Sequence, residues 1–177
     1  TYIEPHSCVV NTAADGSAEF WSCSKVPYGV REQVANALKL PQEKFNFNPV
    51  YIGGDFGGKG DFMDLAVVYL LSKKAGRPVK LVMDYEEEFA AGNPRHASVI
   101  QVKTGVKKDG TLVAHHMNFI FDSGAYGAFK PNAFLNGPHL CAGPYKIPHV
   151  FIEEHMVYTN KIPCGHMRSP GDPQGIF

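Results

Sequence analysis

The sequence predicts an α+β fold in which mixed β-sheets pack with helices, and three observations support this prediction. Two pairs of strand-like segments, residues 4–24 and 96–122, each surround an Asp-Gly turn, which is a strong signal for a β-hairpin. Between them, residues 44–89 follow the order strand, loop, helix, strand, as in a βαβ-like unit. A chain of 177 residues is long enough for one domain, or for two small lobes that share a core.

The first half of the chain begins with the hairpin and continues into a helix. Val30, Val34 and Leu38 recur every four residues and therefore predict a helix of about three turns that closes near Pro41. The segment "KFNFNPVYI", residues 44–52, alternates aromatic and polar residues and is predicted to be a strand that leads into a glycine-rich loop.

A second helix is predicted within residues 61–78, with Asp61 as its N-cap, Lys73 and Lys74 in its last turn and most of its surface buried. Gly76 suits the position after the helix, and Pro78 prevents its continuation. The segment "VKLVMDYEEEF", residues 79–89, is then predicted to be a buried strand.

The second half is predicted to contain a long hairpin over residues 96–122, turning at Lys108-Asp109-Gly110. Residues 122–148 are rich in Gly, Pro and aromatic residues, as in irregular structure that lines a site. A last strand is expected within residues 149–160.

Composition excludes several classes of function. Seventeen basic and seventeen acidic side chains cancel, which argues against a nucleic-acid coat or a polybasic membrane surface. No apolar run reaches the ~18 residues of a membrane-spanning helix. The four cysteines are widely separated, so we expect reduced cytosolic thiols and no zinc ribbon or iron–sulfur site carried by this chain. Both ends suggest a fragment of a longer chain, since one lacks an initiator Met and the other stops within a Gly/Pro-rich turn.

The stretch "YIGGDFGGKGDF", residues 51–62, raises the question of a phosphate-binding loop. Its Gly53-x4-Gly58-Lys59 spacing matches that motif, but Gly60 stands where a Ser or Thr must bind magnesium. A nucleotide-binding protein is therefore kept only as a distant alternative. Paired glycines also let backbone amides approach a ligand, and we favour this reading over a simple tight turn.

A second candidate is the segment "HMRSPGDPQG", where Arg168 precedes a rigid turn and could hydrogen-bond an oxygen-rich group, although a solvated surface Arg is the simpler reading. The eight histidines show no metal-ligand spacing, so no metal ligand is predicted in this chain. The acidic cluster at residues 84–88 is expected to be solvated or to cap the next element.

Five segments, taken in order, resemble the molybdenum-cofactor-binding subunit of the xanthine dehydrogenase/aldehyde oxidase family, the molybdenum hydroxylases. They cover almost the whole chain and are "EPH" at 4–6, "GGDFGGK" at 53–59, "GRPVKLVMDYEEEF" at 76–89, "GPYKIPHV" at 143–150 and "MRSPGDPQG" at 167–175. The resemblance implies that residues 1–177 are the first molybdenum-cofactor-binding subdomain of a longer chain.

The resemblance also implies a molybdenum–pyranopterin cofactor, either molybdopterin or its dinucleotide form. Such enzymes hydroxylate an aldehyde or an N-heterocycle with oxygen from water and pass electrons through [2Fe–2S] clusters, commonly to FAD, on partner domains or subunits. By motif, Phe56 and Gly57 would lie against the metal, with Gly54, Gly58 and Arg168 also at the cofactor. The catalytic glutamate of the family lies farther downstream, so no catalytic residue is expected in this chain, and we expect it to be inactive alone.

Several positions depart from the family pattern. A Thr-Gln pair whose Gln faces the metal's oxo group is here Ser24-Lys25, the third glycine of the loop is Asp55, and the Glu of xanthine-oxidising members is Gly60. Their substrate-clamping Arg falls near Asn136 and their stacking Phe at Pro170.

Lys25, Gly60, Asn136 and Pro170 are therefore the candidate substrate-pocket residues, and they argue against a purine substrate. The remaining alternative is a protein that binds the cofactor, or serves in assembly, with altered or lost hydroxylase activity. Lys25 discriminates between the two, because a cation beside the metal centre would change its electronics.

Overall fold

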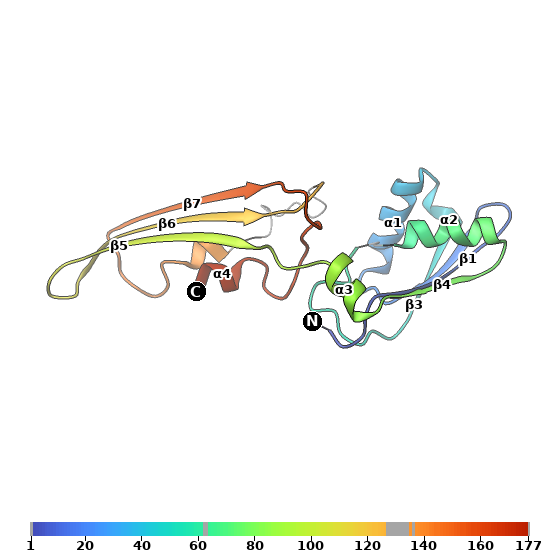
Figure 1. Cartoon of the computed structure of the whole chain (residues 1–177), viewed down its shortest axis with the longest axis horizontal. Helices are drawn as coiled ribbons and strands as arrows, with labels where there is room; N and C mark the ends of the chain where they lie inside the picture. The colour runs from blue at the N-terminus through green and yellow to red at the C-terminus, as the bar shows by residue number, and fades with distance from the viewer. Residues whose placement is uncertain (1, 62–63, 127–134, 136, 177) are drawn as a thin grey trace. The chain divides into compact units, whose positions relative to one another are not determined.

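The structure, a computed structural model, describes residues 2–61, 64–126, 135 and 137–176. The chain divides into two compact units, Thr1–Gly92 and Asn93–Phe177, and each contains its own mixed sheet (Figure 1). The predicted α+β class is thereby confirmed. In the described part of the chain, no helix has the length and the apolar character needed to cross a membrane.

The first unit is a four-stranded sheet in the order β3-β2-β1-β4, with helices packed against it (Figure 1). The hairpin at Asp15-Gly16 is confirmed, and Gly16 takes a φ of +84° in its turn. Strand β3 runs parallel to β2, and β4 runs antiparallel to β1, so the connection through the helix crosses two strands. The elements are β1 (Ser7–Thr12), β2 (Ala18–Ser22), α1 (Pro27–Leu38), the short helix η1 (Gln42–Lys44), β3 (Phe45–Pro49), α2 (Leu65–Ala75), β4 (Val79–Val82) and α3 (Tyr85–Ala91).

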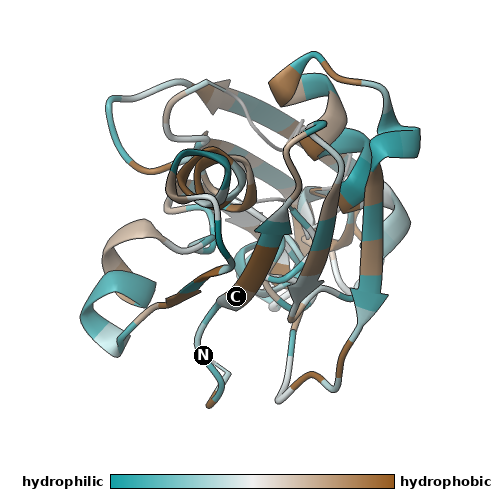
Figure 2. Ribbon diagram, turned by 90° about the vertical axis from the view of Figure 1, so that its right-hand side faces the viewer, coloured by the Kyte–Doolittle hydropathy of each residue, from teal (hydrophilic) through white to brown (hydrophobic). Residues whose placement is uncertain are grey.

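The core of the first unit lies between the sheet and helices α1 and α2. Phe20 on β2 stacks against Phe47 with ring centroids 4.4 Å apart, and Tyr69 of α2 closes the aromatic group. Apolar and polar residues alternate along several strands, as a half-buried sheet requires (Figure 2). Complete burial of side chains such as Val10, Phe20 and Val34 stabilises the unit by roughly 1.5–3 kcal/mol each.

Two local expectations for this unit were wrong. Helix α2 begins at Leu65 with Asp64 as its N-cap rather than Asp61, and Val67 and Leu70 on its outer face are about half exposed. Residues 79–89 form a four-residue edge strand followed by helix α3.

A capping box at the start of α3 explains the second difference. The Glu87 amide donates to the Asp84 carboxylate at 2.8 Å, and the Asp84 amide donates to the Glu87 carboxylate at 2.9 Å. This reciprocal pair satisfies two amides at the helix start, and the glutamates of the first turn favour its positive end. The expected capping role of the acidic cluster is confirmed for Asp84 and Glu87.

The second unit is built on a three-stranded sheet in the order β5-β6-β7. Strands β5 (Ser98–Val106) and β6 (Leu112–Asp122) form the predicted hairpin, and β7 (His149–Val157) pairs in parallel with β6. Two short helices, η3 (Gly137–Leu140) and α4 (Asp172–Ile176), pack against each other. The buried core is formed by Met117, Phe119, Phe121 and Leu135.

Asp122, at the end of β6, ties the sheet to the segment that follows β7. Its carboxylate accepts hydrogen bonds from the Thr159 hydroxyl at 2.6 Å and the Gly124 amide at 2.9 Å, and Lys161 lies at 3.0 Å. These contacts, led by the Thr159 hydroxyl, lower the pKa of Asp122 to about 2. A carboxyl group with a lowered pKa stabilises the fold above its unfolded pKa of about 3.9, and the contribution is lost as pH falls toward 2.

We therefore expect Asp122→Asn to lower the free energy of unfolding by about 1–2 kcal/mol at pH 7. Denaturant titrations of both proteins between pH 7 and pH 2.5 will measure the difference. It should narrow progressively below pH 4, and a difference that stays constant over this range would contradict the assignment to the ionised carboxylate.

Candidate functional site

The glycine-rich loop, residues 50–60, has left-handed backbone at three neighbouring positions. Gly54 and Gly57 take φ values of +104° and +100°, which suit only glycine, while Phe56 between them takes +47°. The left-handed backbone of Phe56 carries a conformational strain of order 1 kcal/mol, and it persists because the surrounding structure holds it in place. The Phe56 side chain is 48% exposed, so the loop presents an aromatic residue at its surface.

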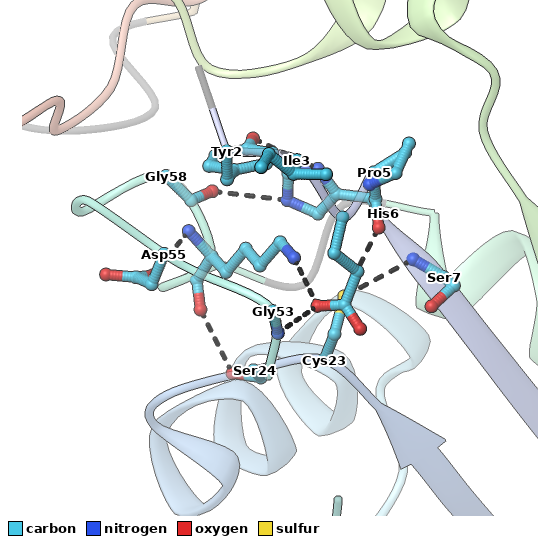
Figure 3. A network of polar contacts seen from close by, with 12 residues as sticks. Tyr2, Ile3, Pro5, His6, Ser7, Cys23, Ser24, Gly53, Asp55 and Gly58 are labelled. Atoms are coloured by element: carbon cyan, nitrogen blue, oxygen red, sulfur yellow. Dashed lines mark hydrogen bonds and ion pairs between the residues drawn. The ribbon is translucent and has the colours of Figure 1, made fainter. Parts of the chain in front are cut away.

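At two other positions of the loop, Gly53 and Gly58, the N-terminal segment packs so closely that it leaves no room for a side chain. A Cβ atom at Gly53 would lie 2.6 Å from the Cβ of Glu4, and one at Gly58 would lie 2.9 Å from the ring of Tyr2. Figure 3 shows the Gly58 carbonyl facing the His6 ring, with Tyr2 beside it. The residue type at positions 53 and 58 thus follows from internal packing.

Lys59 is a buried cation whose charge is satisfied within the unit. Its Nζ lies 2.6 Å from Glu4 Oε2 and 4.7 Å above the centre of the Tyr2 ring. The same Glu4 oxygen accepts the Gly53 amide at 2.7 Å. Lys59 therefore holds the loop against Glu4 and Tyr2 of the N-terminal segment. The lysine of a phosphate-binding loop must instead be free to contact the phosphates of the nucleotide. The contacts of Lys59 argue against the nucleotide-binding alternative.

Asp55 closes the tip of the loop. Its carboxylate accepts the Gly57 amide at 2.6 Å and the Lys59 amide at 2.8 Å, and Lys25 Nζ lies 3.1 Å away. Partial burial opposes the charged form, but the two amides and the Lys25 ammonium outweigh it and hold the pKa of Asp55 below its ordinary value.

Gly60 provides the room that the Lys25 side chain uses. A Cβ atom at Gly60 would lie 3.3 Å from Lys25 Cε. The Lys25 amide also donates to the Lys59 carbonyl at 3.1 Å, which ties the segment before α1 to the loop. Three positions that depart from the family pattern, Lys25, Asp55 and Gly60, are therefore neighbours.

For Glu88, the expectation that the acidic cluster is solvated or caps the next element was wrong, because this side chain is a buried polar group beside the loop. Glu88 of α3 accepts the Tyr2 hydroxyl at 2.5 Å, the His6 amide at 2.8 Å and contacts His6 Nδ1 at 2.7 Å. His6 Nε2 in turn lies 3.2 Å from the Gly58 carbonyl. Burial raises the pKa of Glu88, but the contacts with Tyr2 and His6 outweigh it, so the pKa of Glu88 lies below its ordinary value. The "EPH" segment, which resembles the family pattern, was the available sign that His6 has a structural role. Its partner Glu88 lies 82 positions away and could not be identified from the sequence.

The predicted Arg168 lies in the second unit, on a turn held by another arginine. Arg95 donates to the Arg168 carbonyl at 2.8 Å and to the Ser169 carbonyl at 3.2 Å. Ser169 takes a left-handed φ of +53° just before Pro170, and the Arg168 side chain is exposed. Arg95 thus positions the turn, a role that the sequence analysis did not assign.

The turn after Arg168 packs closely against other backbone segments through Gly137, Gly171 and Gly175. A Cβ atom at Gly137 would lie 1.8 Å from the Gly171 carbonyl oxygen, and one at Gly175 would lie 1.9 Å from the Gly137 oxygen. No side chain can be accommodated at either contact without backbone movement. Of the predicted pocket residues, Lys25 and Gly60 lie in the first unit and Pro170 in the second, while Asn136 lies outside the described residues.

The donors of the loop suit an oxygen-rich cofactor. Its amides already hold one carboxylate, which shows that they can bind anionic oxygen. The cavity behind the loop, lined in part by His6, Cys23 and Lys59, encloses only about 30 Å³, enough for one water molecule. This cavity is therefore too small to hold a pterin cofactor. Within the described residues, no three His, Cys, Asp or Glu side chains gather as metal ligands.

Comparison with known proteins identifies this class of cofactor-binding fold. The chain matches the molybdopterin cofactor-binding domain family over residues 1–177. It is 33% identical over its whole length to a probable xanthine dehydrogenase subunit of Bacillus subtilis, of which it spans 24%. It is 34% identical, over 98% of its length, to the nicotinate dehydrogenase large molybdopterin subunit of Eubacterium barkeri, of which it spans 41%.

The solved structures agree with this assignment. The quinoline 2-oxidoreductase of Pseudomonas putida 86 superimposes with a TM-score of 0.83 at 27% identity, over 96% of this chain and 22% of that one. The chain therefore belongs to the molybdopterin cofactor-binding domain family of the molybdenum hydroxylases. The resemblance drawn from five short segments is confirmed.

Proposed function

We propose that this chain forms one wall of the molybdenum–pyranopterin site of an enzyme that hydroxylates an N-heterocycle or an aldehyde with water. The family match over residues 1–177 carries the proposal. The chain spans less than half of the Bacillus subtilis and Eubacterium barkeri relatives, so we propose that it is the first cofactor-binding subdomain and that the rest of the subunit supplies the catalytic glutamate.

Phe56 and Gly57 are the residues that we place nearest the metal. The exposed Phe56 ring and its left-handed backbone make the tip of the loop the part that a cofactor can reach. Gly54 and Gly58 shape the loop on either side of the tip, and Arg168 offers an exposed guanidinium from a rigid turn to the cofactor's polar groups. Preorganised groups of this kind stabilise charge in a site that excludes water.

An N-heterocycle is the favoured substrate class. One relative is named for nicotinate and one structural neighbour for quinoline, and both compounds are N-heterocycles. Lys25, Gly60, Pro170 and Asn136 replace the residues of xanthine-oxidising members, so we do not expect purine oxidation. When bound, the cofactor supplies the two-electron oxidation of substrate, with oxygen from water.

Electrons are proposed to leave through [2Fe–2S] clusters to FAD on partner domains or subunits, in the cytoplasm. No iron–sulfur cluster is expected on this chain, because its four cysteines are far apart in sequence. An altered or assembly-only protein stays the second candidate, favoured by one observation, the occupation of the Gly57 amide by Asp55.

The test compares the isolated chain with the full-length protein produced together with its partner subunits. We expect about one molybdenum atom per full-length subunit by elemental analysis, and none on the isolated chain, which lacks the downstream pterin contacts. With a dye acceptor, the full-length protein should oxidise N-heterocycles or aldehydes. Molybdenum without oxidation of any such compound would favour the second candidate, and thermal stabilisation by Mg-ATP would favour a nucleotide site.

A further inference from the structure

Lys25 and Asp55 are two departures from the family pattern that carry opposite charges and touch. Their ion pair has N and O atoms 3.1 Å apart, with side chains 42% and 20% exposed. The family residues at the same two positions, Gln and Gly, are both neutral. The net charge at the two positions is therefore the same in both cases.

We infer that Lys25 and Asp55 act as one charge-neutral positioning pair, which fixes the tip of the loop and keeps the charge of Lys25 from acting alone on the cofactor site. The inference rests on the proposed function and deepens it, because it concerns the residues beside the same cofactor. Lys25, taken alone, would have marked the site as electronically altered. Paired with Asp55, it leaves the long-range field of the site close to that of a neutral amide.

The loop geometry supports the positioning role. Asp55 bonds the amides of Gly57 and Lys59 with its two oxygens, and its own carbonyl accepts the Gly58 amide at 2.8 Å. These bonds close a turn around Phe56, the residue at the tip. Removal of the carboxylate would free two amides and loosen the backbone that sets the direction of Phe56.

Gly60 and Ser24 complete the arrangement. Gly60 leaves the space along which the Lys25 side chain runs, and the Ser24 hydroxyl donates to the Lys59 carbonyl at 3.3 Å. A side chain at position 60 would crowd Lys25 and disturb the pair. The absence of a side chain at Gly60 is thus explained by the space that the Lys25 side chain occupies.

Electrostatics predicts opposite effects of the two single substitutions. A free positive charge near a redox centre stabilises its reduced form and raises the potential, and a free negative charge lowers it. The field of a close ion pair falls with distance faster than that of a single charge, so the intact pair has little effect on the potential.

The first experiment follows the loop itself and needs no cofactor. In the purified 177-residue chain, the ¹⁵N–¹H resonances of Gly57 and Lys59 should shift together in one titration step at acidic pH. The step should disappear in Asp55→Asn and move to higher pH in Lys25→Gln. Loop resonances that do not respond to Asp55 would overturn the positioning role.

The second experiment measures the midpoint potential of the molybdenum centre in the full-length protein with its partner subunits. We expect Asp55→Asn to raise it, Lys25→Gln to lower it, and the double variant to return close to the parent value. Lys73→Gln, an exposed lysine in the last turn of α2, is the matched control and should leave it unchanged. Shifts of the same sign in the two single variants, or a double variant whose potential stays far from the parent value, would overturn the neutral-pair inference.

The two experiments separate this inference from the proposed function. A full-length protein that retains no molybdenum refutes the proposed function and the electronic part of the inference together. The titration of the loop amides decides the positioning part in either case. A loop that titrates as expected beside a potential that ignores both substitutions would leave Asp55 as a positioning residue and refute the electronic role.

Discussion

Glu88→Ala is expected to lower the free energy of unfolding by about 3–5 kcal/mol. The side chain is buried and serves three contacts, one from the Tyr2 hydroxyl and two from His6. Truncation removes the acceptor that these buried donors share, at a cost of about 1–3 kcal/mol for each group left unpaired. The cavity left behind adds to the loss.

Denaturant unfolding followed by circular dichroism will measure this change. Glu86→Ala is the matched control, because Glu86 lies in the same turn of α3 but is exposed, and its replacement should change stability by less than about 0.5 kcal/mol. Glu88→Gln should fall between the two, since its amide retains one acceptor. Equal stabilities for the Glu88→Ala and Glu86→Ala variants would show that the buried group contributes nothing.

Gly137→Ala is expected to destabilise the second unit by about 3 kcal/mol. The added methyl group would lie 1.8 Å from the Gly171 carbonyl oxygen, a backbone atom that no side-chain rotation can move aside. Relief of this contact requires the turn after Arg168 to shift. Binding of the proposed molybdenum–pyranopterin cofactor, for which Arg168 is a proposed contact, should therefore weaken together with stability.

The control for this substitution is Gly29→Ala in helix α1. The nearest atoms to its new methyl group would be those of Val26 at 3.9 Å, and alanine is the better helix former by about 0.5–1 kcal/mol. We therefore expect opposite signs for two substitutions of the same chemical kind, measured by thermal unfolding. A neutral Gly137→Ala would mean that the turn adjusts freely.

The sequence was informative where short local patterns decide the structure. The Asp15-Gly16 and Asp109-Gly110 turns predicted both hairpins correctly. The recurrence of Val30, Val34 and Leu38 at every fourth position predicted α1 correctly. The prediction of one strand over residues 79–89 was wrong, because the apolar β-forming residues are followed directly by a capping box. This box starts helix α3 and so ends the strand.

The interactions that shape the candidate site could not be predicted from local patterns. Lys25 and Asp55 lie 30 positions apart, and the pairing of His6 with Glu88 spans 82. Periodicity and turn signals act over a few residues, so they cannot show which charges meet. The motifs located the loop and the Arg168 turn, while the positioning roles of Asp55 and Arg95 required the fold.

The docking of the N-terminal segment under the loop has a kinetic consequence. Glu4 and Tyr2 fill the space beside Gly53 and Gly58, and their contacts join residues 49 to 86 positions apart. Contacts of such separation form only after a large entropic cost of closing the chain has been met, which slows folding. The loop is thus expected to take its shape late, after the hairpins, once the segment that carries Tyr2 and Glu4 has docked beside it.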